Sequence, residues 1–247
     1  MSIYSKSHAY WSGRAAEYSA LHMAEYETPD QTRFKTIIEQ YLPRVNGAVR
    51  ALDVGAGSGF LTLLLAQMNC EVTAIDFSQD MLDEAKKNAS QQGFSNIEFF
   101  KMPAQSLDFS DNTFDIVVTR NVTWVLEDVA SVYAEMMRVL KPGGVLINMD
   151  ANYGKAFASA EKRGETPVHV TQTLDQLLTR NSLVRDLEIT QRDRPTWDIA
   201  TLWNLNATHI ECFRSIEELL AYKNIIIKDE VQQARFGSSL FVLAAFK

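Results

Sequence analysis

Three alternate glycines follow an apolar stretch of the chain directly, in the run Asp53-Val54-Gly55-Ala56-Gly57-Ser58-Gly59. Because glycine has no Cβ atom, such a turn lets the backbone come close to a bound molecule. The helix expected after the turn presents free N–H groups and a partial positive charge at the same place. The sequence therefore predicts a binding site for a ligand with polar or anionic groups.

An acidic residue, Asp76, ends the next apolar stretch. A carboxylate at this place can accept hydrogen bonds from both hydroxyls of a ribose, which several classes of nucleoside cofactor contain. Dinucleotide-binding proteins carry G-x-G-x-x-G at such a turn, but Phe60 occupies the position of their third glycine, which disfavours a pyrophosphate. On the residues alone, a turn without a ligand and a helix-capping role for Asp76 stay open.

The elements that must position these residues alternate between short β-branched runs and stretches with apolar residues at helical spacing. This alternation is typical of an α/β fold, in which helices cover both faces of a parallel sheet. We expect strands at 50–54, 71–75, 96–100, 114–119 and 144–149, and helices at 61–68, 79–92 and 128–140. The run Lys141-Pro142-Gly143-Gly144 is expected to end the last helix in a turn, because proline cannot continue it.

The flanking segments lie outside this alternating pattern. Residues 1–48 are expected to form a helical flap, with helices at 9–23 and 30–41, in front of a core at 49–150. We expect residues 151–206 to form a cap insertion. Residues 156–164 are small and polar, and a short helix is expected at 174–178. Residues 207–247 would complete the sheet with strands at 207–213 and 239–246.

Taken with Phe114-Asp115-Ile116-Val117-Val118 and Leu140-Lys141-Pro142-Gly143-Gly144, these motifs resemble the class I S-adenosylmethionine (SAM)-dependent methyltransferases. The resemblance covers about residues 49–150. It is strongest to the branch that methylates small molecules, whose members often begin with an aromatic-rich helix similar to residues 10–18. The resemblance implies a Rossmann-like, doubly wound, seven-stranded and mostly parallel sheet with an antiparallel last strand, a helical cap, and SAM as cofactor.

The resemblance also implies which residues bind the cofactor. Gly55, Ala56 and Gly57 would line its methionine part, Asp76 would hold the ribose, and Phe77 and Met81 would pack against the adenine. Pro103 stands where many relatives have an acidic residue and has neither a side-chain acceptor nor an N–H, so the backbone of Ala104 and Gln105 would read the adenine edge. The other expected cofactor-binding residues are Trp11, Tyr18, Asp53, Gly59, Met102, Arg120 and Asn121, with Trp11 and Tyr18 on one face of a single helix.

The sulfonium of SAM already activates the methyl group, so the protein must mainly align the two reactants and exclude water. If the acceptor has to lose a proton, the candidate bases are His22, Tyr18 and Asp150. Histidine and cysteine show no metal-ligand spacing, which predicts a reaction without a metal.

Three further functions are consistent with the same residues. An enzyme of the same fold could cleave or cyclise the aminobutyrate chain of SAM and release methylthioadenosine. The chain could also be a nicotinamide-dependent oxidoreductase, or a protein that binds SAM without catalysis.

Composition limits the partners of the chain. It has 247 residues and a net charge of −7, so a basic clamp on nucleic acid is disfavoured and a small-molecule substrate is favoured. No apolar run resembles a signal-peptide core or a membrane span, and Cys70 and Cys212 are the two cysteines. We therefore expect a cytoplasmic protein without a membrane partner, and the sequence gives no oligomeric state.

Overall fold

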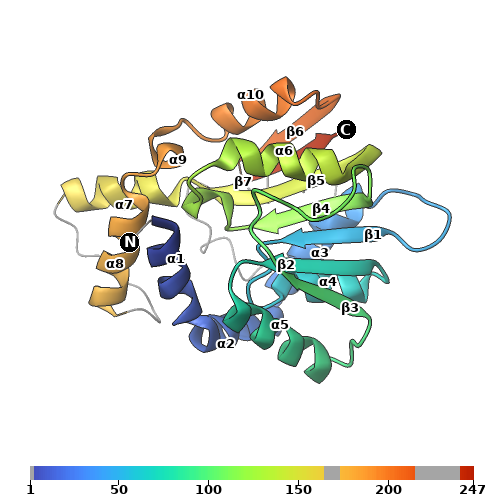
Figure 1. The fold of residues 1–247 in the computed structure, drawn as a ribbon, viewed down its shortest axis with the longest axis horizontal. Coiled ribbons are helices and arrows are strands. Elements are labelled where there is room, and N and C mark those ends of the chain that lie inside the picture. Colours follow the sequence, from blue (N-terminus) through green and yellow to red (C-terminus); the bar gives the residue numbers. More distant parts are fainter. Residues whose placement is uncertain (1–2, 164–172, 215–239) are drawn as a thin grey trace.

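The computed structural model describes residues 3–163, 173–214 and 240–247 (Figure 1). Within these residues, seven strands form one sheet in the order β3-β2-β1-β4-β5-β7-β6. The strands are β1 (Arg50–Val54), β2 (Glu71–Asp76), β3 (Ile97–Lys101), β4 (Phe114–Arg120), β5 (Leu140–Ala151), β6 (His209–Phe213) and β7 (Leu240–Phe246). Strand β7 runs antiparallel to both β5 and β6, whereas the pairs from β3 to β5 are parallel. The predicted doubly wound sheet with an antiparallel last strand is confirmed.

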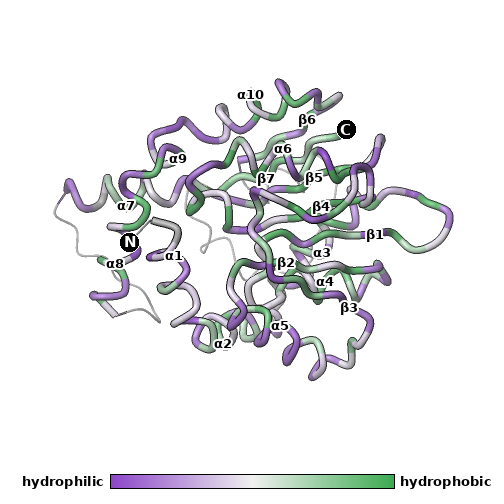
Figure 2. Tube along the Cα trace, in the orientation of Figure 1, coloured by the Kyte–Doolittle hydropathy of each residue, from purple (hydrophilic) through white to green (hydrophobic). Residues whose placement is uncertain are grey.

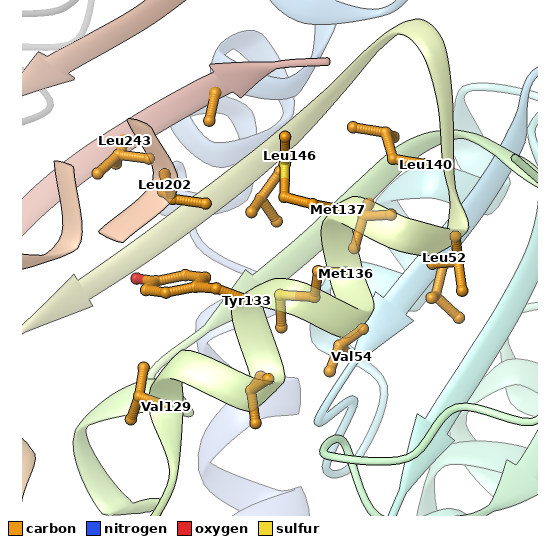
Figure 3. Close-up of a cluster of buried hydrophobic side chains, with 14 of the residues drawn as sticks. Leu52, Val54, Val129, Tyr133, Met136, Met137, Leu140, Leu146, Leu202 and Leu243 are labelled. Carbon is orange, nitrogen blue, oxygen red and sulfur yellow. The ribbon is translucent and has the colours of Figure 1, made fainter. Parts of the chain in front are cut away.

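Alternate residues of each strand face opposite layers of helices, as the period of a strand requires. Ala51 of β1 belongs to the core formed with α3 (Asp30–Tyr41) and α4 (Phe60–Gln67), and Leu52 belongs to the core formed with α6 (Val129–Val139) and α10 (Thr196–Asn204). Figure 3 shows this second layer, in which the apolar face of α6 lies on the sheet. Hydrophobic residues accordingly dominate the central strands in Figure 2, because both faces of the sheet are covered.

The N-terminal segment forms two helices, α1 (Ile3–Ser12) and α2 (Ala15–Tyr26), where one helix at 9–23 was expected. The prediction of one continuous helix is wrong. Gly13 is a poor helix former, and the side chain of Arg14 pairs with Glu17 at 2.9 Å in the first turn of α2. Trp11 and Tyr18 therefore lie on different helices, although their rings still meet, with centroids 5.7 Å apart.

The segment between β5 and β6 is more helical than its sequence indicates. It contains α7 (Tyr153–Lys162), α8 (Leu174–Val184) and α9 (Glu188–Gln191), so most of 156–164 is helical and the helix expected at 174–178 is longer. Strand β5 begins at Leu140, before the expected turn, because Leu140 pairs with Phe114 ahead of a register shift. Two residues of the expected segments lie outside the described residues. They are Gly164, the last residue of 156–164, and Ser239, the first residue of the strand at 239–246.

Two topological facts position the site. The parallel strands β1, β2 and β4 lie side by side, so their carboxyl ends meet at one edge of the sheet. In Figure 1 the arrowheads of β1 and β4 point toward the side where α1, α7 and α8 gather. Helix α5 (Gln79–Gln91) starts just after β2 and contacts α1 and α2, so the N-terminal helices are held beside this edge.

Candidate active site

A cavity with an empty volume of about 1140 Å³, including its open mouth, lies at the carboxyl ends of β1, β2 and β4. Ligands of open α/β sheets bind at this end of the strands. Every predicted cofactor-binding residue except Gly59 lines the cavity: Trp11, Tyr18, Asp53, Gly55, Ala56, Gly57, Asp76, Phe77, Met81, Met102, Ala104, Gln105, Arg120 and Asn121. The structure thus brings together residues that lie up to 110 positions apart in the chain (121 − 11).

The glycine turn forms the floor of the cavity. Gly55 and Gly57 have φ values of +71° and +54°, in the left-handed region that favours glycine. A Cβ atom on Gly55 would lie 2.4 Å from Cγ2 of Val122, so this position has no room for a side chain. At Gly57 the nearest atom to an added Cβ would be Cε1 of Tyr18 at 3.6 Å, so Tyr18 lies directly above the turn.

Asp76 is the last residue of β2 and is buried beside the turn. Its Oδ2 accepts a hydrogen bond from the N–H of Gly57 and its Oδ1 accepts one from the N–H of Ser78, each at 2.9 Å. Burial raises the pKa of Asp76 to about 6, although these backbone donors oppose the shift. A carboxylate has about four acceptor sites, so capacity remains for two further donors such as ribose hydroxyls.

A second carboxyl group, Asp53, lies under the turn near the end of β1. Its Oδ2 accepts a hydrogen bond from Oγ1 of Thr62 at 2.6 Å. Burial raises the pKa of Asp53 to about 7, and the nearby charge of Asp76 adds to the shift. The cavity therefore has two carboxyl groups that a cationic ligand would help to ionise.

The side of the cavity expected to hold adenine is built from two segments. Phe77 lies just before α5 and Met81 lies in its first turn, where Ser78 caps the helix by accepting from the N–H of Met81 at 3.3 Å. Residues 102–105 follow β3 and also line the cavity. The two segments therefore border one region of the cavity, the region to which the sequence assigns the adenine.

Aromatic side chains from the N-terminal helices form a further wall. The ring of Tyr18 contacts those of Trp11 and His22, with centroid distances of 5.7 Å and 4.1 Å, and His22 lies 5.8 Å from Phe60. Hydroxyl groups also join this wall to the core, because Oγ of Ser12 lies 2.7 Å from Oγ of Ser78. A sulfonium in the cavity would meet the faces and edges of these rings.

Arg120 ends β4 and connects the wall to the sheet. Its guanidinium lies 4.1 Å and 4.5 Å from the ring centroids of Phe34 and Phe60, and its Nη2 donates to Oε1 of Glu25 in α2. The next residue, Asn121, has a left-handed φ of +57°, and its N–H donates to the carbonyl of Met149 at 3.0 Å. The backbone after β4 is thus held to β5 at the border of the cavity.

The structure brings two of the three candidate bases to the cavity. Burial, together with the charge of Arg120, lowers the pKa of His22 to about 3, so its imidazole is neutral. Burial raises the pKa of Tyr18 to about 12, so its hydroxyl is protonated at neutral pH. Asp150 does not line the cavity: it is fully buried in the core, where its Oδ2 accepts from Oγ1 of Thr123 and the N–H of Trp124.

Gly59 also lies outside the lining, although it belongs to the turn. It precedes α4 with a φ of +93°, and an added Cβ would lie 3.2 Å from Cβ of Ala85. Close packing of α4 against α5 therefore explains this glycine without a ligand.

Sequence reasoning missed several residues of the lining. These are Ser7, Phe60, Leu61, Ile75, Val122, Val125, Leu126 and Glu127. Residues 122–127 follow β4, and the rule that loops after parallel strands border the site could have found them. No pattern in the sequence points to Ser7, which reaches the cavity through the packing of α1.

Two classes of site are absent from the part of the chain that the structure describes. Within residues 3–163, 173–214 and 240–247, no group of three histidine, cysteine or acidic side chains could hold a metal ion. No helix in these ranges has the length and apolar character needed to cross a membrane.

A family model described as a methyltransferase domain matches residues 52–148, the segment that supplies the glycine turn, Asp76 and Arg120. This segment is similar to the domain of class I SAM-dependent methyltransferases. Two curated relatives of this methyltransferase domain are a ubiquinone/menaquinone biosynthesis C-methyltransferase of Desulfotalea psychrophila and a phosphatidylethanolamine N-methyltransferase of Cereibacter sphaeroides, 40% and 39% identical. The matches cover 42% and 46% of this chain, and 42% and 57% of the relatives. The chain thus spans about half the length of the curated relatives it matches.

The likeness in fold extends beyond the matched segment. A solved structure of a SAM-dependent methyltransferase from Thermotoga maritima superposes with a TM-score of 0.62 and 14% sequence identity, covering 97% of this chain and 99% of that one. At this identity the likeness concerns the methyltransferase fold alone.

Proposed function

We propose that the protein is a SAM-dependent methyltransferase that acts on a small molecule. The observation that carries the proposal is the cavity at the ends of β1, β2 and β4, in which the glycine turn, the Asp76 carboxylate and an aromatic wall come together. Two relatives of the domain are named for ubiquinone/menaquinone biosynthesis and for phosphatidylethanolamine, which supports a substrate outside nucleic acids.

Each part of the cavity has a role in this proposal. The turn at Gly55–Gly57 holds the methionine part of SAM, Asp76 accepts the ribose hydroxyls, and residues 77–81 and 102–105 enclose the adenine. Tyr18 would border the methionine part, since its ring packs against Gly57 and lines the cavity. Bound SAM would supply an activated methyl group.

The contribution of the protein to the transfer is mainly alignment and exclusion of water. The aromatic wall of Trp11, Tyr18 and His22 would exclude water, and Arg120 and Asn121 would border the acceptor. Neutral His22 is a weak base because its pKa is about 3, and Tyr18 stays protonated. The acceptor is therefore expected to reach the site with its nucleophilic lone pair already free.

The experiment that tests the proposal is product analysis by mass spectrometry. The protein is incubated with SAM alone and then with SAM and a pool of small metabolites, with the Asp76→Ala variant as the control for the site. S-adenosylhomocysteine together with a methylated acceptor supports the proposal. Methylthioadenosine would indicate cleavage of the aminobutyrate chain instead.

The same incubations distinguish a methyltransferase from a SAM-binding protein and from an oxidoreductase. Binding of SAM with no product from any pool would indicate a binding protein, and oxidation of a nicotinamide cofactor would indicate an oxidoreductase. Phe60 fills the place of the third dinucleotide glycine and contacts His22 and Arg120, which argues against nicotinamide chemistry.

Three further expectations belong to this proposal. We keep the division into a flap at 1–48, a core at 49–150, a cap at 151–206 and final strands at 207–247. The flap and the core both line the cavity, which supports these two parts of the division. The net charge of −7 supports the absence of a nucleic-acid partner. The low cysteine content, two in 247 residues, supports a cytoplasmic location.

A further inference from the structure

Six buried polar side chains form one hydrogen-bonded network beside the cavity without lining it. They come from the segment after β4, from α6, from β5, from the turn before α10 and from its first turn: Thr123, Tyr133, Asn148, Asp150, Arg194 and Asp198. This network, called here the Arg194 network, includes Asp150, which the sequence suggested as a catalytic base.

The network holds one cation between two carboxylates. Nη2 of Arg194 lies 2.7 Å from Oδ1 of Asp198, and Nη1 lies 3.8 Å from Oδ2 of Asp150. The side chains of all three residues are fully buried. Well-packed apolar residues of similar volume often stabilise a fold as well as a buried ion pair does, so stability alone is weak grounds for this arrangement.

Thr123 is the point where the network reaches the segment after β4. Its Oγ1 donates to Oδ2 of Asp150, and it accepts from Nη2 of Arg194 at 2.6 Å and from Nδ2 of Asn148 at 3.2 Å. Oδ2 of Asp150 also accepts from the N–H of Trp124 at 3.1 Å. Side chains from β5 and from the turn before α10 therefore fix the consecutive residues Thr123 and Trp124.

The fixed residues control two positions of the cavity. Val122, next to Thr123, packs against Gly55 on the side to which a Cβ atom would point, since an added Cβ would lie 2.4 Å from Val122 Cγ2. Trp124 donates from its indole Nε1 to the carbonyl of Asn121 at 2.9 Å. Val122 and Asn121 both line the cavity. A shift of Thr123 would therefore be transmitted to the glycine turn and to the residue after β4.

We propose that Arg194 and Asp150 are positioning residues, which act through Thr123 to hold residues 121–127 against the glycine turn. The inference rests on the proposed function, because the turn is taken as the cofactor floor. A polar network behind residues 121–127 would then set the geometry of the glycine turn, the floor of the cavity.

The test uses Thr123→Val, which keeps the shape of the side chain and removes the hydroxyl, and Thr123→Ser, which restores the hydroxyl. In the unliganded protein, hydrogen exchange of residues 121–127 and 55–59 is measured for both variants. The Thr123→Val variant should exchange faster in both segments and should bind S-adenosylhomocysteine about tenfold more weakly. Thr123→Ser should stay within about twofold of the wild type in affinity.

Val145→Ala is the matched control, since Val145 is buried in the middle of β5, five residues before Asp150. It should lower the melting temperature while leaving exchange at 55–59 and the affinity unchanged. Equal effects of Val145→Ala and Thr123→Val, or unchanged exchange at 55–59 in Thr123→Val, would overturn the inference. The exchange measurement needs no ligand, so a wild-type protein that fails to bind S-adenosylhomocysteine would refute the proposed function and leave this coupling separately testable.

Discussion

At the scale of single residues, Asp76 has the most specific expected role. Replacing it with alanine removes the acceptor for two ribose hydroxyls, and we expect SAM binding to weaken by about 1–3 kcal/mol, measured by calorimetry. Asp80→Ala is the control, because Asp80 is an exposed acidic residue in the first turn of α5. An unchanged dissociation constant in a folded Asp76→Ala protein would remove Asp76 from the ribose site.

The raised pKa values of Asp53 and Asp76 predict a pH-dependent affinity. In the free protein burial raises these values to about 7 and about 6, so both groups bind protons more readily than in the unfolded chain. SAM carries a sulfonium and an ammonium, which favour the ionised carboxylates, so binding releases protons. The affinity for SAM should therefore rise from pH 5 to pH 8.

Calorimetry in two buffers of different ionisation enthalpy checks this release of protons. The Asp53→Asn variant should lose part of the pH dependence and keep the affinity measured at low pH. An affinity that is constant from pH 5 to pH 8 would mean that neither carboxyl group changes its ionisation on binding.

Residue types alone predicted most of the cofactor-binding residues of the cavity. They wrongly indicated Asp150 as a base at the site. The glycine turn and Asp76 follow or end strands that pair with each other, so they reach the same edge of the sheet. The sequence shows Asp150 near the end of a strand too. Its carboxylate faces the core because Arg194, 44 positions later in the chain (194 − 150), supplies a buried charge there.

At the scale of elements, the core strands were predictable because short β-branched runs separated by turn residues rarely form any structure other than a strand. The N-terminal helices were harder to predict, since nothing in the run Ser12-Gly13-Arg14 shows whether the glycine bends or breaks a helix. Helix α7 was missed because its sequence is mostly small and polar, and its position depends on contacts with α8 and α9.

The break between α1 and α2 produces a prediction about the aromatic wall. Trp11 and Tyr18 belong to different helices, which contact the core through residues such as Ser12, Glu25 and His22. A ligand that bridges these helices to the core raises the free energy of their local opening. Bound S-adenosylhomocysteine should slow hydrogen exchange of the backbone amides at 10–23.

The Tyr18→Ala variant extends this test to activity. It should lower turnover while the free energy of unfolding changes little, because Tyr18 packs against Gly57 at the cavity floor. Leu21→Ala serves as the control, since Leu21 is an exposed residue of the same helix. If bound ligand protected the glycine turn and left exchange at 10–23 unchanged, the N-terminal helices would be scaffold rather than a cover.

At the scale of the whole molecule, the cavity is shared between the methyltransferase domain and segments outside it. The matched domain at 52–148 supplies the turn, Asp76 and Arg120, whereas Trp11, Tyr18 and the rest of the N-terminal wall precede it. The sheet order places β1 between β2 and β4, so one cavity can take its floor, its carboxylate and its arginine from three adjacent strands. We expect the core to determine which cofactor binds, and the N-terminal helices together with Arg120 and Asn121 to determine which acceptor binds.

The measurement that tests the proposed site most directly is a crystal structure of the protein with S-adenosylhomocysteine. We predict the ribose hydroxyls within hydrogen-bond distance of the Asp76 carboxylate, the adenine between residues 77–81 and 102–105, and the homocysteine part against the backbone of Gly55–Gly57 and beside the ring of Tyr18. Density for the ligand anywhere other than this cavity, or a ribose turned away from Asp76, would contradict the central claim.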